Sequence, residues 1–201
     1  VVEVRDANGN PVQSAGTNIT AAIASGGGTL TGTTTVATDA NGRATFTNLA
    51  ISGSVGDRTL SFSAGSLTPA TSGTITLSAG PAAQMAINGG DGQSAVAGQA
   101  VAVLPSVIVR DANDNPVEGV SVNFAVASGG GSVTGASATT NASGIATVGS
   151  WTLGTAVGEN TLTATSDGLT GSPLLFTATA QNAPPTAPVI TAPTPGATVL
   201  I

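Results

Sequence analysis

Two short stretches carry the residue types best suited to binding a cation, and they are almost identical. The first reads Asp6-Ala7-Asn8-Gly9-Asn10 and the second reads Asp111-Ala112-Asn113-Asp114-Asn115. Oxygen-bearing side chains at alternate positions resemble the beginning of a calcium loop of the Asp-x-Asn-x-Asn type. The cation candidates are therefore Asp6, Asn8, Asn10, Asp111, Asn113 and Asn115.

The residues that follow each stretch favour a turn between two strands. A calcium loop needs a glycine at its sixth position and a glutamate at its twelfth, and neither stretch has them. Asp, Asn and Gly readily reverse the direction of the chain, and the proline that follows can start a strand only at an edge. A turn is the preferred interpretation, and cation binding is the alternative.

The composition excludes much of the chemistry that enzymes use. The chain of 201 residues has no Cys, His, Tyr or Lys, so the commonest general base, thiolate ligands and Schiff-base lysines are all missing. The acidic residues are scattered and form no evident pair for acid–base catalysis. A net charge of −6 argues against a nucleic-acid partner, whose phosphates require a basic surface. We therefore expect a protein that is not an enzyme and holds no cofactor.

The two stretches belong to a longer internal repeat. Thr38-Asp39-Ala40-Asn41-Gly42 returns as Thr140-Asn141-Ala142-Ser143-Gly144, which indicates a unit of about 100 residues. A unit of this size with many short strands is typical of an immunoglobulin-like sandwich. We expect an all-β chain of tandem Ig-like Greek-key β-sandwiches. Residues 1–80 form a sandwich without its opening strands, residues 81–181 form a complete one, and residues 182–201 form a Pro-rich linker and the first strands of a further domain.

Alternation of apolar and polar residues predicts the strands and the core. Strands are expected at residues 43–49, 71–77 and 145–153, and at 101–110 with Pro105 as a break or an edge, with almost no helix. Trp151 aligns with Leu49, so we expect the indole in the core rather than on an exposed sugar-binding surface. The predicted inward-facing side chains are Val2, Val4, Ile19, Ile23, Phe46, Leu49, Leu60, Phe62 and Ile75 in the first unit, and Val107, Val109, Val120, Val122, Phe124, Val126, Ile145, Trp151, Leu162, Ala164 and Phe176 in the second.

The first unit has no counterpart of residues 83–105, so we expect an open edge with a groove at Val2 and Val4. No apolar run in the chain is long enough to cross a membrane. The end of the chain could add a strand to such a groove in a neighbouring subunit. The alternative is that the chain is a window of a longer protein. The strand-exchange candidates are Val189, Ile190, Val199, Leu200 and Ile201.

The repeated motifs are similar to those of a known family. The chain resembles bacterial Ig-like domains of the Big-1 type, which are tandem modules of intimin- and invasin-like surface proteins. The second unit covers the pattern from end to end, and the first lacks its beginning. The resemblance rests on Val-x-Val-x-Asp-Ala-Asn-x-Asn-Pro-Val, Val122-Asn123-Phe124, Ser128-Gly129-Gly130-Gly131, Thr140-Asn141-Ala142-Ser143-Gly144-Ile145-Ala146, Trp151-Thr152-Leu153-Gly154 and Gly158-Glu159-Asn160-Thr161-Leu162.

The resemblance implies a structural repeat of an extracellular bacterial stalk, fibre or filament. Such a repeat spaces the cell surface from its surroundings or links the two, and strand addition between subunits could assemble it. The expected partners are neighbouring Ig-like domains or identical subunits, on the surface of a bacterium or outside it. The alternative is an adhesin module that binds a host protein or a glycan directly.

Overall fold

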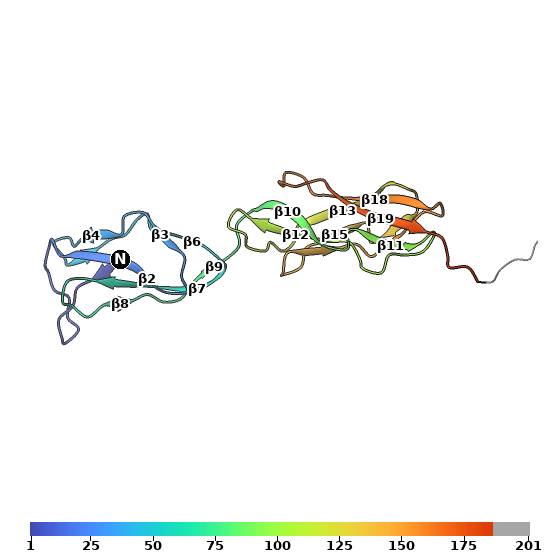
Figure 1. Cartoon of the computed structure of the whole chain (residues 1–201). Coiled ribbons are helices and arrows are strands. Elements are labelled where there is room, and N and C mark those ends of the chain that lie inside the picture. Colours follow the sequence, from blue (N-terminus) through green and yellow to red (C-terminus); the bar gives the residue numbers. More distant parts are fainter. Residues whose placement is uncertain (187–201) are drawn as a thin grey trace, which may run out of the picture.

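The computed structural model describes residues 1–186 and contains β-strands but no helix among them. Two β-sandwiches lie end to end along the chain (Figure 1). The first contains β1 (Val2–Glu3), β2 (Asn18–Ser25), β3 (Thr29–Thr31), β4 (Thr35–Ala37), β5 (Arg43–Ala44), β6 (Ala50–Ser52), β7 (Gly56–Ser63), β8 (Ala70–Thr71) and β9 (Ile75–Leu77). Among residues 1–186, no helix is long and apolar enough to span a membrane.

The second sandwich is built from two facing sheets and a short pair of strands. One sheet has the order β11-β19-β18-β13-β15, the other has the order β10-β12-β16, and β14 pairs with β17. These strands are β10 (Ala82–Gly89), β11 (Gln93–Val96), β12 (Ser106–Asp111), β13 (Ser121–Ser128), β14 (Ser132–Thr134), β15 (Ser137–Thr139), β16 (Ile145–Thr147), β17 (Ser150–Thr152), β18 (Gly158–Thr165) and β19 (Leu174–Gln181).

The first sandwich repeats this plan with fewer strands. Its larger sheet has the order β4-β2-β7-β8, and β9 also pairs with β7. The corresponding strands β2 and β13 show the same alternation of buried and exposed residues along all eight positions. The predicted fold class, tandem Ig-like Greek-key β-sandwiches, is confirmed.

Four predicted strands are shorter than the alternation suggested. The run at residues 43–49 contains only β5 and is followed by β6, while the run at 145–153 divides into β16 and β17. The division reflects a change of partner, because β16 pairs with β12 whereas β17 pairs with β14. The run at 71–77 divides into β8 and β9, and the run at 101–110 forms a strand only from Ser106 onward. A proline before Ser106 has no N–H to donate, which explains the late start.

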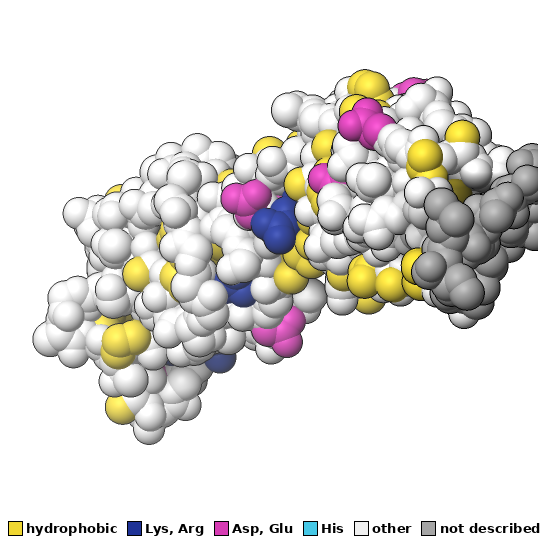
Figure 2. Space-filling model, turned by 45° about the vertical axis from the view of Figure 1, so that its right-hand side comes forward, with side chains coloured by type: hydrophobic (Ala, Val, Ile, Leu, Met, Phe, Trp, Pro, Cys, Tyr) yellow, Lys and Arg dark blue, Asp and Glu magenta, His cyan; other side chains and the backbone are white. Residues whose placement is uncertain are grey.

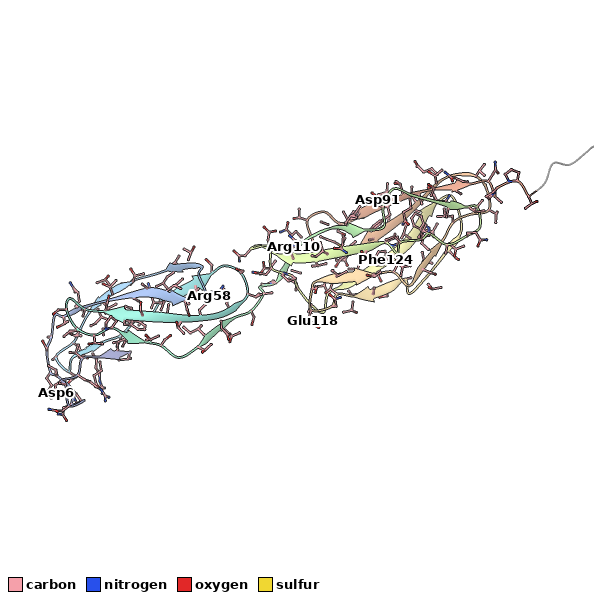
Figure 3. The ribbon with its side chains drawn as sticks, turned by 60° about the horizontal axis from the view of Figure 1, so that its bottom comes forward. Asp6, Arg58, Asp91, Arg110, Glu118 and Phe124 are labelled. Atoms are coloured by element: carbon pink, nitrogen blue, oxygen red, sulfur yellow. The ribbon has the colours of Figure 1, made fainter. Side chains whose placement is uncertain are left out.

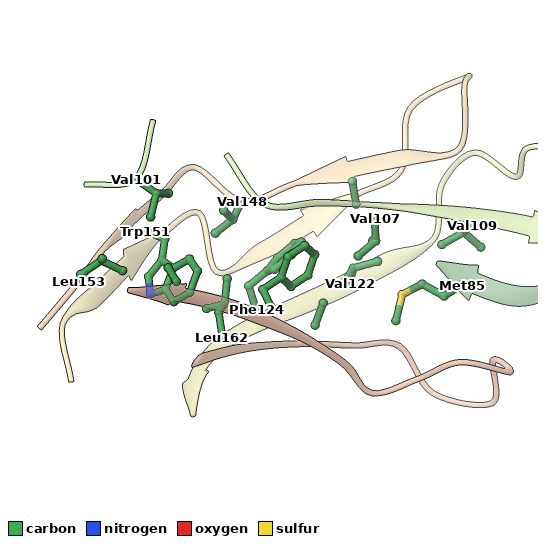
Figure 4. Close-up of a cluster of buried hydrophobic side chains, with 14 of the residues drawn as sticks. Met85, Val101, Val107, Val109, Val122, Phe124, Val148, Trp151, Leu153 and Leu162 are labelled. Atoms are coloured by element: carbon green, nitrogen blue, oxygen red, sulfur yellow. The ribbon is translucent and has the colours of Figure 1, made fainter. Parts of the chain in front are cut away.

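The core of the second domain is extensive and dry. Trp151 and Phe176 are fully buried and Phe124 is 2% exposed, which confirms the core position predicted for the indole. The rings of Phe124 and Phe176 pack at a tilt with centroids 6.4 Å apart. Figure 4 shows Trp151 among apolar side chains from both sheets. All the predicted inward positions of this domain are buried except Val120, Val126 and Ile145, which are half-buried.

The core of the first domain is much smaller than expected. Of its predicted core residues, only Ile19 and Leu60 are buried. The prediction for Ile75 was wrong, because this side chain is 38% exposed on a strand with few neighbours. The other predicted positions are half-buried, namely Val2, Val4, Ile23, Phe46, Leu49 and Phe62.

The matched leucines Leu60 and Leu162 test this difference in packing. Leu162→Ala should lower the free energy of unfolding of the second domain by about 2–5 kcal/mol, because its closed core cannot collapse around the cavity. Leu60→Ala should cost the first domain less than about 2 kcal/mol, because the buried apolar cluster of this domain is small and Leu60 lies outside it. Trp151 fluorescence reports the second domain alone, and circular dichroism reports both. Equal losses in the two domains would contradict this account.

Candidate functional site: the joint between the two domains

The turn Asp111–Asn115 lies at the end of the second domain that faces the first. Its carboxylate organises the turn, because Oδ1 of Asp111 accepts backbone N–H groups from Asn113 at 2.8 Å and from Asn115 at 2.9 Å. Asp114 adopts a positive φ of 63°, where the first domain has Gly9 with a φ of 83°. Aspartate is among the few residues with a side chain that tolerate this conformation, so both sequences form the same turn.

The side chain of Asn115 connects this turn to the first domain. Its Nδ2 donates to the carbonyl oxygen of Gly53 at 3.1 Å, and its Oδ1 accepts the backbone N–H of Val55 at 2.9 Å. One amide group thus bonds to a donor and an acceptor of the same loop, much as a neighbouring strand would. The contact fixes direction as well as distance, because both bonds must be satisfied together.

Asp111 makes a second connection across the boundary. Its Oδ2 accepts the backbone N–H of Gly80 at 2.8 Å and Nδ2 of Asn115 at 2.9 Å. Nε2 of Gln84, on β10 of the second domain, donates to Oδ1 of Asp114 at 2.8 Å and so ties the turn to the strand that follows the linker. The short link between the sandwiches is therefore fixed by the same turn that contacts the loop at Gly53 and Val55.

The side chains of Asp111 and Asn115 are both shielded from water. Asp111 is 2% exposed and Asn115 is 4% exposed. Burial, the largest single influence, raises the pKa of Asp111, but the hydrogen bonds from Asn115, Gly80 and Asn113 outweigh it and lower the pKa to about 2. A charged carboxylate surrounded by N–H donors is the stable form in this joint.

Arg58 supports the same loop from inside the first domain. The side chain is 3% exposed, its Nη2 donates to the carbonyl oxygen of Ser54, and its Nη1 donates to the carbonyl oxygen of Asp57 at 3.2 Å. The corresponding residue of the second domain, Asn160, is 1% exposed and accepts the N–H of Gly154 at 2.9 Å. Each domain thus uses one buried polar side chain to shape this loop. In the first domain that loop meets Asn115.

The first domain carries the same turn at its opposite end. Oδ1 of Asp6 accepts backbone N–H groups from Asn8 at 2.9 Å and from Asn10 at 2.8 Å, and Nδ2 of Asn10 donates to Oδ2 at 3.1 Å. The hydrogen bonds from Asn10 lower the pKa of Asp6 below its usual value. Figure 3 shows Asp6 at the end away from the second domain, whereas Arg58 and Arg110 lie nearer the junction. Asp6 and Asn10 are exposed.

The cation candidates therefore form two separate turns. In each turn the Asp and the last Asn meet through their side chains, while Asn8 and Asn113 donate backbone N–H groups to the carboxylate. In the range that the structure covers, no group of three or more His, Cys, Asp or Glu side chains gathers at one point. Cation binding stays an alternative prediction for these residues.

The strand-exchange prediction names groove residues, which the structure describes, and donor residues, which it does not. Val2 and Val4 line a hollow of about 310 Å³. The proposed donor residues Val189, Ile190, Val199, Leu200 and Ile201 lie outside the described residues. Exchange between subunits therefore stays a prediction.

Sequence reasoning missed the partners of the turn. Gly53, Val55 and Gly80 contribute backbone atoms, which every residue has, so no residue type marks them. The one signal in the sequence was the recurrence of Asp and Asn four positions apart in both copies, and it marks the turn but not the contact that the turn makes.

Comparison with known proteins finds one family model that matches within the second domain. Residues 89–180 match the family model described as bacterial Ig-like domain (group 1). None of the curated proteins matches the chain.

Solved structures that are similar to the chain include intimin, invasin and InvD, and also two glycosidases from Bacteroides species. The D0-D1 domain of intimin is 19% identical, with 88% of this chain and 84% of that one covered, at a TM-score of 0.36. Invasin, described as a bacterial integrin-binding protein, is 20% identical, with 90% and 35% covered, at a TM-score of 0.41. InvD of Yersinia pseudotuberculosis is 22% identical, with 90% and 51% covered, at a TM-score of 0.48. The chain spans about half of InvD and about a third of invasin.

The family match covers the second sandwich from β11 onward and includes the turn of the joint. It agrees with the motifs on which the resemblance was based. Residues 89–180 of this chain are a bacterial Ig-like domain of group 1.

Proposed function

We propose that the chain is a non-enzymatic spacer of an extracellular bacterial surface protein, in which tandem Ig-like domains are held in line. The observation that carries this proposal is the joint formed by Asp111 and Asn115 with Gly53, Val55 and Gly80. The family of the second domain, known for tandem modules, supports the location outside the cell. Neighbouring Ig-like domains are the partners that this role requires.

A hydrogen-bonded joint suits a spacer better than a flexible linker does. Domains in one chain usually move relative to each other unless their interface is large or well fixed. Here the bonds are directional and their side chains are shielded from water, which strengthens each of them. The link between β9 and β10 is also short, so it leaves little slack for bending.

Both ends of the two-domain unit present the elements of the same joint. The turn at Asp6 and Asn10 faces away from the second domain, and the segment Thr155–Val157 aligns with Gly53–Val55 at the far end of the second domain. Tandem extension in either direction would then reuse one type of contact. This arrangement supports a spacer whose length depends on the number of domains.

Direct adhesion is the alternative, and the side chains give it less support. Binding sites for proteins and sugars rely on exposed aromatic and Arg anchors. Within residues 1–186, Trp151 is fully buried and all four Phe side chains are buried or half-buried. Figure 2 shows a face with few charged groups. A surface protein or a glycan as direct ligand stays a prediction that these features do not favour.

The variants Asn115→Ala and Asn10→Ala form a matched test of the joint. Each variant removes the last asparagine side chain from the corresponding turn of one domain, but only Asn115 contacts another domain. Asn115→Ala should remove two hydrogen bonds worth about 0.5–1.5 kcal/mol each and so broaden the range of angles between the domains. Small-angle X-ray scattering and residual dipolar couplings measure this range.

Asn10→Ala should leave the alignment of the two domains unchanged. Both variants should keep two folded domains, which circular dichroism and Trp151 fluorescence verify. If both variants, or neither, loosened the alignment, Asn115 would not be the residue that holds the domains in line.

Acid should loosen the joint through Asp111. The pKa of this carboxyl is about 2 in the joint and near 3.8 when its hydrogen bonds are absent, so the stabilisation is complete above 3.8 and is lost as the pH falls through about 2. Dipolar couplings recorded from pH 5 to pH 2 should therefore show increasing freedom of motion between the domains. The cause is the loss of the charge-assisted hydrogen bonds that the carboxylate of Asp111 accepts.

The variant Asp111→Asn provides the control for acid loosening. Its amide cannot titrate, and its NH2 group would face the N–H donors of Gly80 and Asn115. The joint of this variant should be loose already at pH 5 and should change little down to pH 2. An alignment of the unaltered chain that is constant over this range would rule out the ionised carboxylate as its cause.

A further inference from the structure

The first and last segments of the second domain lie side by side and run in the same direction. Gln84 forms a parallel bridge with Thr170, and farther along the chain β11 pairs in parallel with β19. The paired residues are 85 or 86 positions apart in the sequence. We name residues 82–97 the opening segment and residues 170–181 the closing segment. The opening segment starts beside the first domain, and the closing segment ends at the opposite end (Figure 1).

Backbone hydrogen bonds join the two segments at both of their ends. Near the first domain, the N–H of Met85 donates to the carbonyl oxygen of Thr170 at 2.8 Å, and the N–H of Thr170 donates to the carbonyl oxygen of Ala83 at 2.9 Å. At the opposite end, the N–H of Ala97 donates to the carbonyl oxygen of Gln181 at 2.8 Å. The contact therefore begins and ends with direct bonds between the segments.

Asp91 joins the two segments between these ends. Its Oδ1 accepts a hydrogen bond from the backbone N–H of Thr177 at 2.7 Å and another from Oγ1 of the same residue at 3.0 Å. The bond from the N–H of Thr177 is the main cause that holds the pKa of Asp91 below its usual value, so the carboxylate is charged at neutral pH. A charged acceptor makes these bonds stronger than bonds between neutral groups.

Both segments are also anchored in the core of the domain. Met85 of the opening segment is 4% exposed, and Phe176 of the closing segment is fully buried in the same cluster. Gly171 allows the close approach, because its φ is 90° and a Cβ atom there would overlap the carbonyl oxygen of Met85. One segment can therefore slide past the other only if buried side chains leave the core.

This arrangement determines how the domain responds to tension along the chain. A pull on both ends of the domain enters at Ala82 and leaves at Gln181. Because the segments are parallel and the pull acts at opposite ends, they must slide past each other, and the bonds between them are loaded at the same time. Bonds that open one after another from a single end present a lower barrier, and this barrier governs forced unfolding.

We propose that the opening and closing segments form a clamp that lets the second domain carry tension along the chain, and that Asp91 is a positioning residue of this clamp. The clamp goes beyond the spacer role, because a spacer requires alignment whereas a clamp resists extension. Its use outside the cell rests on the proposed function, but its resistance to force depends on the second domain alone. Failure of the joint and failure of the clamp are therefore separate outcomes.

Single-molecule pulling of the full chain in two directions tests the clamp. The chain has no cysteine, so pairs of introduced cysteines provide the only thiol attachment points. The pair Ser78→Cys and Asn182→Cys pulls on opposite ends of the two segments and loads the clamp in shear. The pair Ser78→Cys and Asp167→Cys pulls on their neighbouring ends and peels the contact open from Met85 and Thr170. All three substituted positions are exposed.

The shear direction should require a force roughly twofold higher or more than the peeling direction at the same pulling speed, because the bonds must break together. Equal forces in the two directions would overturn the clamp. Neither result depends on the Asn115 contact, so the dipolar couplings of the joint still decide the spacer function by themselves.

The variants Asp91→Ala and Asn141→Ala separate the clamp from general stability. Each removes an exposed side-chain oxygen that accepts two backbone N–H groups, but Asn141 caps a turn outside the two segments. Asp91→Ala should lower the force in the shear direction, whereas Asn141→Ala should leave that force unchanged. Urea denaturation followed by Trp151 fluorescence gives the loss of unfolding free energy in each variant for comparison. An equal effect of both variants on the shear force would exclude Asp91 from the clamp.

Discussion

The hydrogen-bonded contact between the Asn115 amide and the loop at Gly53 and Val55 is the interaction on which the arrangement of the two domains depends. Each sandwich folds around its own core, so nothing in the packing of either one determines the angle between them. A side-chain amide can bond to a peptide N–H and a carbonyl at once, which makes it a one-residue substitute for a pairing strand. The buried carboxylate of Asp111 holds that amide in position.

Much of the fold was predictable because it depends on side-chain alternation and on repetition. The recurrence of the Asp39 turn at Asn141 indicated two copies, and both side chains cap the turn in the same way. The burial of Trp151 followed from its alignment with Leu49. The divided strands were not predictable, because alternation continues through residues 145–153 while the chain passes from one sheet to another.

The residues of the candidate site were predictable from the sequence, but their contact with another domain was not. Asp111 and Asn115 were selected by residue type, yet the same types at Asp6 and Asn10 lie in an exposed turn. What distinguishes the two turns is the presence of another domain, and local sequence does not encode it. The small core of the first domain has a similar origin, since Val4 has the residue type of a core position but is only half-buried by the strands of residues 1–186.

The joint contains no ion pair. Its buried carboxylate, Asp111, is surrounded by neutral N–H donors, and the salt bridges formed in the described part of the chain join Glu3 to Arg5 and Arg43. Dissolved ions screen exposed opposite charges strongly but affect short, buried hydrogen bonds little. The two domains should accordingly keep the same relative orientation in fresh water and in brine, a useful property for a molecule whose surroundings change in ionic strength.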